Sequence, residues 1–253
     1  MYTTNLWHQL NLSGKKIIIA GSLFILACFF NDVYAQRQRV INLPDYDRKT
    51  MHYGFQIGVF QSTMALKHSE YFASVDNPSP ESVISVNPIS RPGFSLGFVA
   101  NFALKDELWD LRLLPNVSFY NRALEYTFAN GQTETLEKEM TFVEVPFMLK
   151  YKSMRRGNHR MFMQAGLTGG VKVGGKKEEE GQDENFDFNR YNLEVSYGFG
   201  FHFYMQMFNF SPEIRFSHGL VNLFKRPSQS NEYSQPIERL TTHKITLFLN
   251  FEG

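Results

Sequence analysis

Polar and apolar residues alternate over the stretch from Met140 to Val173. In its first half, one parity carries Thr141, Val143, Val145, Phe147, Leu149 and Tyr151, and the other carries Glu144, Pro146, Met148, Lys150 and Lys152. A period of two predicts a β-strand, because successive side chains leave opposite faces of the strand. The run is about twice the usual strand length and reaches the roughly 9–11 residues that a strand needs to cross a bilayer. The stretch therefore predicts a transmembrane β-hairpin with residues 153–159 as its short turn.

The same alternation recurs along the chain, so that this hairpin supplies the fourth and fifth of eight predicted strands. The other six are residues 51–61, 93–103, 109–121, 190–205, 208–220 and 240–251. Eight strands make the smallest common closed membrane barrel, and closure is required because unpaired strand edges cannot be left in lipid. The connections alternate between long and short, as in outer-membrane barrels with short periplasmic turns. We therefore expect an all-β, eight-stranded antiparallel transmembrane barrel over residues 51–253, in the outer membrane of a Gram-negative bacterium and with both termini periplasmic.

Two further patterns refine this barrel. Asn130-Gly131 in the third connection is a strong two-residue hairpin signal, which predicts that strands three and four continue as a ribbon above the membrane. Glycines cluster on the parity that would face a narrow bore, where side chains have little room. They are Gly54, Gly58, Gly97, Gly166, Gly170, Gly198 and Gly200. A soluble, lipocalin-like barrel would turn the apolar parity inward. In such a barrel the charges of the other parity would not fit: charges are very costly in a dry core. We therefore expect the apolar parity to face lipid, a surface that 25 Phe and 12 Tyr suit.

The first 35 residues resemble an export signal. Lys15 and Lys16 precede an apolar run from Ile17 to Phe30, and Ala35 offers a cleavage position. We expect residues 1–35 to be a signal peptide and residues 36–50 to be a flexible periplasmic lead-in. The alternative is a lipoprotein anchored at Cys28. Because this is the one cysteine of the chain, an intrachain disulfide is excluded.

Charge and motifs exclude several functions. The 26 basic and 25 acidic residues give no basic face for nucleic acid. Ser217 and His218 are adjacent on a strand and therefore point to opposite faces, so they cannot act as nucleophile and base. The acidic run over residues 178–187 lacks the ordered spacing of a calcium loop. We expect no cofactor, no metal and no enzymatic activity.

The inward parity carries charges of both signs. We expect these side chains to pair across the bore as a lumenal polar network, and a hydrolase or lipid-modifying site around His202 is the alternative. The network comprises Arg112, Glu144, Lys150, Lys172, Glu194, His202, Glu213 and Arg215. In the outside loops, four aromatic side chains are candidates for contact with a partner protein, and anchoring of the loops is an equally ordinary role for them. These are Phe186, Phe188, Phe224 and Tyr233.

Several segments together resemble one family. The segment Glu144-Val145-Pro146-Phe147-Met148-Leu149-Lys150-Tyr151 is similar to a strand of small outer-membrane barrel domains. The segments Gln164-Ala165-Gly166-Leu167, Tyr197-Gly198-Phe199-Gly200 and the run from Glu213 to Leu223 extend the resemblance to the PorT family. One departure is the ending Phe251-Glu252-Gly253, which displaces the usual terminal aromatic residue by two positions.

The resemblance implies an accessory component of type IX secretion, and of gliding motility where that exists. It would support the export of cargo that carries C-terminal sorting signals. Its partners would be outer-membrane lipid and the other outer-membrane and periplasmic components of the secretion machinery. The family supplies no catalytic residues to carry over. The runner-up hypothesis is an envelope-stabilising or adhesin-like barrel outside that system.

Overall fold

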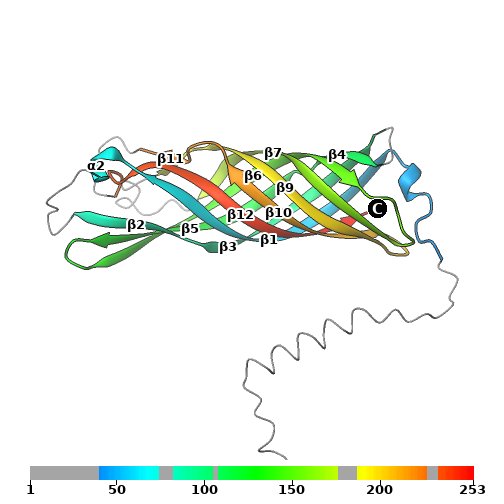
Figure 1. Cartoon of the computed structure of the whole chain (residues 1–253), viewed down its shortest axis with the longest axis horizontal. Coiled ribbons are helices and arrows are strands. Elements are labelled where there is room, and N and C mark those ends of the chain that lie inside the picture. Colours follow the sequence, from blue (N-terminus) through cyan, green and yellow to red (C-terminus); the bar gives the residue numbers. More distant parts are fainter. Residues whose placement is uncertain (1–39, 74–81, 105–107, 176–186, 227–232) are drawn as a thin grey trace, which may run out of the picture. The chain divides into compact units, whose positions relative to one another are not determined.

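The computed structural model describes residues 40–73, 82–104, 108–175, 187–226 and 233–253 (Figure 1). The proposed signal peptide and Cys28 lie outside these residues. The described elements are η2 (Tyr46–Arg48), β1 (Met51–His68), α2 (Glu70–Ala73), β2 (Val83–Ile89), β3 (Arg91–Ala103), β4 (Trp109–Leu113), β5 (Asn116–Phe128), β6 (Thr133–Lys152), β7 (His159–Gly175), β8 (Asp187–Phe188), β9 (Tyr191–Tyr204), β10 (Asn209–Gly219), β11 (Phe224–Lys225) and β12 (Ile237–Glu252). No helix among the described residues is both long and apolar enough to cross a lipid bilayer.

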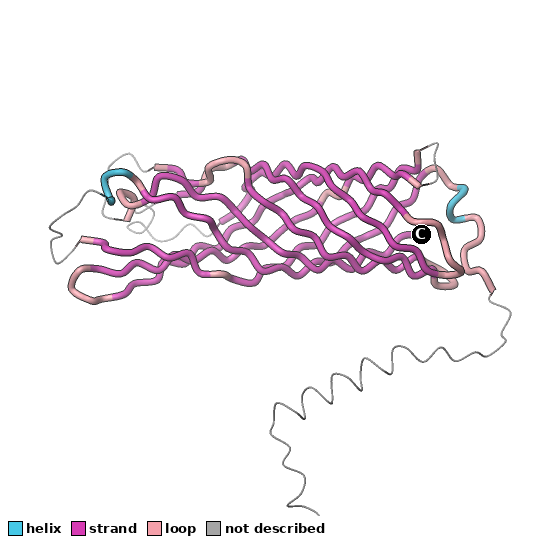
Figure 2. The backbone as a smooth tube through the Cα atoms, in the orientation of Figure 1, coloured by secondary structure: helices cyan, strands magenta, loops and turns pink. Residues whose placement is uncertain are grey.

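The long strands form a closed antiparallel ring (Figure 2). From β3 onward each strand pairs with the next one around the ring, and β1 closes it by pairing with both β12 and β3. β4 and β5 act as one wall strand, interrupted at Leu114 and Pro115 where proline has no N–H to donate. The ring therefore has the eight positions predicted from the sequence, and the eight-stranded antiparallel barrel is confirmed.

The two faces of the wall have opposite chemistry. On β6, the outward Phe147 is 52% exposed, whereas the inward Lys150 is 0% exposed. The same contrast runs around the ring, where the outward side chains form an apolar belt. Its members include Phe55, Ile57, Val59, Phe94, Leu96, Phe98, Val145, Leu149, Leu167, Leu193, Phe199, Ile245 and Leu247. A soluble barrel would show the reverse arrangement, so the lipocalin-like alternative is excluded.

The two ends of the barrel differ. We call the end with the turns 153–158 and 205–208 the turn end, and the opposite end the loop end. Val40 and the C-terminus both lie at the turn end (Figure 1). At the loop end, β5 and β6 run on as a paired ribbon from Tyr120↔Met140 to Thr127↔Thr133. The turn at its tip contains Gly131 with a φ of 83°, a backbone conformation that favours glycine. The predicted ribbon is confirmed.

The first connection differs from the expected loop over residues 62–92. β1 continues to His68, and residues 83–89 form β2, which pairs with β5 between Val83↔Phe128 and Ile89↔Ala123. Beyond the belt the outward positions become polar, and the inward positions change from polar or charged to apolar. These segments therefore still have one face to bury, although they no longer face lipid. That apolar inner face fills the loop end of the barrel with one cluster of buried side chains, which we call the loop-end core. Its members are Phe60, Met64, Val83, Val86, Tyr120, Leu124, Tyr126, Met140, Phe142, Phe188, Leu223, Phe224, Ile237 and Leu240.

Candidate functional site

The inside of the barrel below the loop-end core is polar and charged. Arg112 of β4 lies at its centre and is fully buried. Its Nη1 donates to Glu213 Oε2 of β10 at 3.1 Å and to Gln164 Oε1 of β7 at 2.9 Å. Its Nη2 donates to Glu252 Oε1 of β12 at 2.9 Å. One guanidinium thus joins four wall strands, and Arg215 adds a second cation to Glu213 at 2.6 Å.

A second group of charges lies on the neighbouring strands. Asp110 of β4 accepts from Asn101 Nδ2 at 2.9 Å and lies 2.5 Å from Lys152 Nζ and 3.8 Å from Lys150 Nζ. The Lys150 ammonium also lies 4.5 Å from the ring centroid of Phe162. Burial on this scale is tolerated because each charge has a counter-charge or an aromatic face within reach.

A third group separates the first two from the loop-end core. Lys244 Nζ of β12 donates to both carboxylate oxygens of Glu144 at 2.9 Å and lies 3.3 Å from Glu194 Oε2. Tyr120 donates to Glu144 Oε1 at 2.5 Å, and Ser118 donates to Oε2 at 3.0 Å. Every described lumenal carboxylate therefore lies against a cation.

His202 is the member of the network that could suggest catalysis. Its Nδ1 lies within hydrogen-bond distance of Asn209 Nδ2, at 2.6 Å, and of Ser211 Oγ, at 2.7 Å. The separation of the serine oxygen and the histidine nitrogen is short enough for a nucleophile and its general base. However, Ser211 is fully buried, and the described residues give His202 Nε2 no partner, so no carboxylate orients the ring as in a catalytic triad. The geometry matches a packed polar pair rather than a reactive one. Within the described residues, no three side chains are grouped so as to hold a metal ion.

Lys172 is the one predicted network residue that does not face the bore. Its Nζ donates to Asp187 Oδ1 at 2.8 Å and to the Phe188 carbonyl at 3.1 Å, at the rim of the loop end. At this height the strand has left the belt, so a side chain of the inward parity meets the loops above the bore. Burial raises the pKa of Asp187, but the hydrogen bonds from Lys172 and the Phe188 amide outweigh it and hold that pKa below its usual value.

For three of the four loop aromatics, the structure favours the anchoring role over contact with a partner protein. Phe188 and Phe224 are 2% and 4% exposed, and they are paired across the small sheet of β8 and β11 inside the loop-end core. Tyr233 is partly buried, packs edge-on against Tyr126 at 5.2 Å and donates to Glu134 at 2.8 Å. These three side chains anchor the loops and do not form an exposed contact surface. They cover the inward apolar side chains of the wall at the loop end. Phe186 lies outside the described residues.

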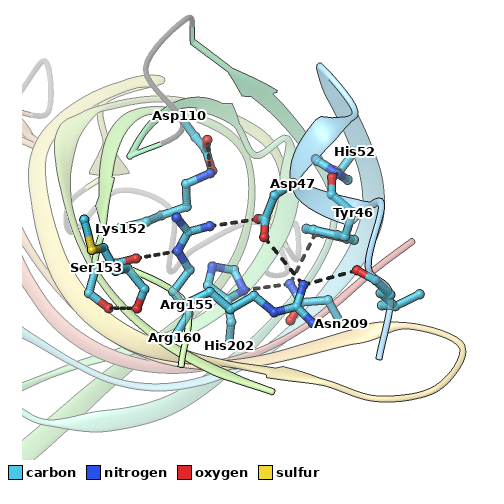
Figure 3. Close-up of polar contacts among 12 residues, drawn as sticks. Tyr46, Asp47, His52, Asp110, Lys152, Ser153, Arg155, Arg160, His202 and Asn209 are labelled. Atoms are coloured by element: carbon cyan, nitrogen blue, oxygen red, sulfur yellow. Dashed lines mark hydrogen bonds and ion pairs between the residues drawn. The ribbon is translucent and has the colours of Figure 1, made fainter. Parts of the chain in front are cut away.

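The segment expected to be a flexible lead-in is ordered from residue 40 onward. We call residues 40–50 the strap, because they cross the turn end of the barrel (Figure 3). Tyr46 is 7% exposed, stacks on His52 at 3.9 Å and donates to Glu252 Oε2 at 3.0 Å. Burial, and then the Glu252 charge, raise the pKa of Tyr46, so the phenol stays neutral and acts as a donor.

Ion pairs hold the strap to the turn between β6 and β7. Asp47 lies 2.8 Å from Arg160 Nη1 and 3.5 Å from Arg155 Nη1, and Arg155 also donates to the backbone carbonyls of Asn42 and Leu43 (Figure 3). The guanidinium of Arg155 covers the Tyr204 ring at 3.8 Å. The alternation pattern could not reveal this contact, because the strap has no period of its own. Two signals were available: the mixed charge of residues 45–49, and the parity of β12, which places Glu252 inside.

Three solved structures are similar to this chain at low sequence identity. Neisserial surface protein A is 9% identical, with a TM-score of 0.40, over 78% of this chain and 95% of that chain. OprG from Pseudomonas aeruginosa is 11% identical, with a TM-score of 0.43, over 79% and 94%. Ail, the attachment invasion locus protein of Yersinia pestis, is 14% identical, with a TM-score of 0.34, over 81% and 100%. No curated protein sequence matches the chain. A family model described as outer membrane protein beta-barrel domain matches residues 34–225. The chain therefore belongs to the outer membrane protein beta-barrel domain family.

Proposed function

We propose that this barrel is a non-enzymatic accessory component of type IX secretion, similar to the PorT family, which supports assembly or stability of the secretion machinery. One observation supports the proposal: two sets of side chains fill the bore. They are the buried ion pairs and, at one end, the loop-end core. A small barrel with a filled bore has no lumen through which to pass cargo. Its contribution must therefore be made by its surfaces. The segment from Glu144 to Tyr151, which carries the resemblance most clearly, lies in β6, the longest wall strand.

In this proposal the turn end faces the periplasm. A cleaved signal peptide over residues 1–35 delivers the chain there, and the strap begins on that side. Its partners are outer-membrane lipid around the belt and protein components of the machinery at the two ends. The absence of nucleic acid from this list rests on the balanced charge.

The test is deletion of the gene followed by fractionation of cargo proteins that carry C-terminal sorting signals. We expect cargo to accumulate in the periplasm and to return to the outside when the wild-type gene is restored. Normal export in the deletion strain would overturn the proposal while leaving the fold unaffected.

One substitution separates the accessory role from an outer-membrane enzyme. His202→Ala should restore export as well as the wild type does, because the ring only packs against Asn209, Ser211 and Phe162. An inserted His202→Ala barrel that fails to restore export would instead favour chemistry at the Ser211–His202 pair.

A second candidate is an envelope-stabilising or adhesin-like barrel, and the β5–β6 ribbon favours it. The ribbon extends beyond the belt and exposes polar side chains near its tip, including Thr133, Glu134 and Thr135. Replacing these three residues by alanine should reduce attachment of cells to surfaces if the ribbon binds there. Unchanged attachment, together with lost export in the deletion strain, would favour the secretion role.

A further inference from the structure

Two histidines meet on the outer face of the barrel, away from the bore and the strap. His218 of β10 and His243 of β12 are directly opposite in the strand register. Their Nδ1 atoms lie 2.7 Å apart, with ring centroids at 5.0 Å and an interplanar angle of 64°. Both side chains are partly exposed. Neither the filling of the bore nor the proposed secretion role uses this pair.

The position of the pair makes it accessible to water. Along β10, Phe216 of the apolar belt lies on one side of His218, and the strand ends one residue beyond it. On the neighbouring β1, Thr63 is the register partner of His243. The pair therefore lies at the loop-side edge of the belt, where the outward surface changes from apolar to polar.

Two imidazoles that face each other through the same nitrogen have two chemical options. One Nδ1–H can donate to the other Nδ1, or both nitrogens can offer lone pairs to one cation. A tetrahedral ion with metal–nitrogen bonds of about 2.0–2.1 Å requires the two nitrogens to be about 3.3 Å apart. The observed 2.7 Å reaches that spacing by a small rotation of two partly exposed rings.

Tyr197 of β9 supplies the outer support that such a ligand needs. Its hydroxyl lies 3.1 Å from His218 Nε2, and the two rings stack at 5.7 Å. When Nε2–H donates to the Tyr197 oxygen, the tautomer is set so that Nδ1 carries the lone pair. Metal-binding histidines characteristically donate their other N–H in this way.

We propose that His218 and His243 form a binding site for a divalent transition-metal ion of the Zn²⁺ class, with Tyr197 as a positioning residue. Imidazole nitrogen suits zinc, nickel and copper, whereas calcium and magnesium require oxygen ligands. The described residues provide no group of three metal-binding side chains here. The site therefore contributes two ligands, and water completes the coordination. This inference does not depend on the secretion role.

The test uses the full-length barrel, purified in detergent without a histidine tag and titrated with Zn²⁺ by calorimetry. We expect one zinc ion per chain, no binding of Mg²⁺ and loss of zinc binding in His218→Ala and in His243→Ala. Tyr197→Phe should weaken binding by roughly 10–100-fold while leaving the stoichiometry unchanged. His159→Ala is the matched control, because His159 lies at the turn end with its ring against Phe203.

If an alanine variant does not fold, the wild-type barrel alone still tests whether zinc binds the two histidines. Zinc should shift the ring resonances of two histidines in the NMR spectrum and leave the others in place. Absence of saturable zinc binding to the wild type would overturn the proposal and leave the pair sharing a proton. Undiminished binding in folded variants of both histidines would also overturn it.

Discussion

At the scale of single residues, two lumenal cations each contact two carboxylates. Arg112 joins Glu213 and Glu252, which lie on neighbouring strands, and Lys244 joins Glu144 and Glu194. A buried ion pair is a weak source of net stability, because desolvation of the charges offsets their attraction. Its effect is instead asymmetric: removal of one partner leaves a charge buried without compensation.

Arg112→Ala should therefore destabilise the folded barrel by about 3–5 kcal/mol, because two buried carboxylates each lose an ion-pair partner. The measurement is the free energy of unfolding in urea, made in detergent or lipid vesicles. Arg48→Ala is the control, since the Arg48 side chain is 82% exposed and, among the described residues, forms an ion pair with the exposed Asp45 alone. Equal small effects of the two substitutions would show that the lumenal charges are hydrated rather than paired.

Two glycines of β7 allow a matched test of close packing. A Cβ on Gly166 would lie 2.0 Å from the Phe147 carbonyl oxygen, whereas a Cβ on Gly169 would meet nothing within 4 Å. Gly166→Ala should cost about 1–3 kcal/mol of unfolding free energy, because the wall must move apart. Gly169→Ala should be close to neutral. Indistinguishable unfolding curves for the two variants would contradict the explanation that close packing requires glycine at position 166.

At the scale of elements, the belt determines how far each strand is embedded. Phe199→Arg on β9 places a cation on the lipid face, because Phe199 is outward and pairs with Ile214 at the middle of β10. The substitution should lower the unfolding free energy by about 2–4 kcal/mol, as expected near the bilayer midplane. Thr135→Arg makes the same change on β6 beyond the belt, where Thr135 is exposed, and should have little effect. Insertion and stability of both variants in vesicles are the measurements. A Phe199→Arg barrel as stable as the wild type would mean that this position does not face lipid.

The small sheet of β8 and β11 should respond to acid. Hydrogen bonds from Lys172 and the Phe188 amide hold the pKa of Asp187 below its usual value, despite the opposing effect of burial. The stabilisation is therefore fully present above the unfolded pKa of about 3.9 and is lost as pH falls through the lower folded pKa. Because the carboxylate is 38% exposed, the effect should be about 1 kcal/mol or less. NMR detection of β8–β11 opening should give a wild-type advantage over Asp187→Asn at neutral pH that disappears in acid. A constant difference across this pH range would exclude the mechanism.

The alternation of the sequence predicts the elements better than it predicts their contacts. It predicts the wall strands, their inward and outward faces and the ribbon around Asn130-Gly131, because a period of two determines direction directly. It does not predict that Arg112 meets Glu252, 140 residues away, because parity carries no register. It also does not predict that Phe188 and Phe224 are buried. An aromatic residue in a polar loop is expected to be exposed unless the apolar cluster that it covers is known. The course of the strap had no periodic signal at all.

At the scale of the whole barrel, the two ends are closed by different means. The loop end is filled by side chains of the wall and its loops, whereas the turn end is crossed by the strap. The strap is held by contacts to the ends of strands and to the turn between β6 and β7, including the polar contacts of the Tyr46 and Asp47 side chains. Local opening of such a segment costs less free energy than unfolding of a closed ring of strands. The strap is therefore the part of the described barrel most easily released.

The double substitution Tyr46→Ala and Asp47→Ala should release the strap without opening the bore. Loss of a buried aromatic side chain lowers the local opening free energy by about 3 kcal/mol, so amide hydrogens of residues 46–49 should exchange much faster. The wall strands should keep their protection, and planar bilayers should show no persistent ion conductance, because the Arg112 network and the loop-end core still fill the lumen. Asp45→Ala is the control, since Asp45 is exposed and pairs only with Arg48. Ion conductance in the double variant would show that the strap, and not the lumenal side chains, blocks the bore. Faster amide exchange throughout the wall strands would show that the strap unfolds together with the barrel.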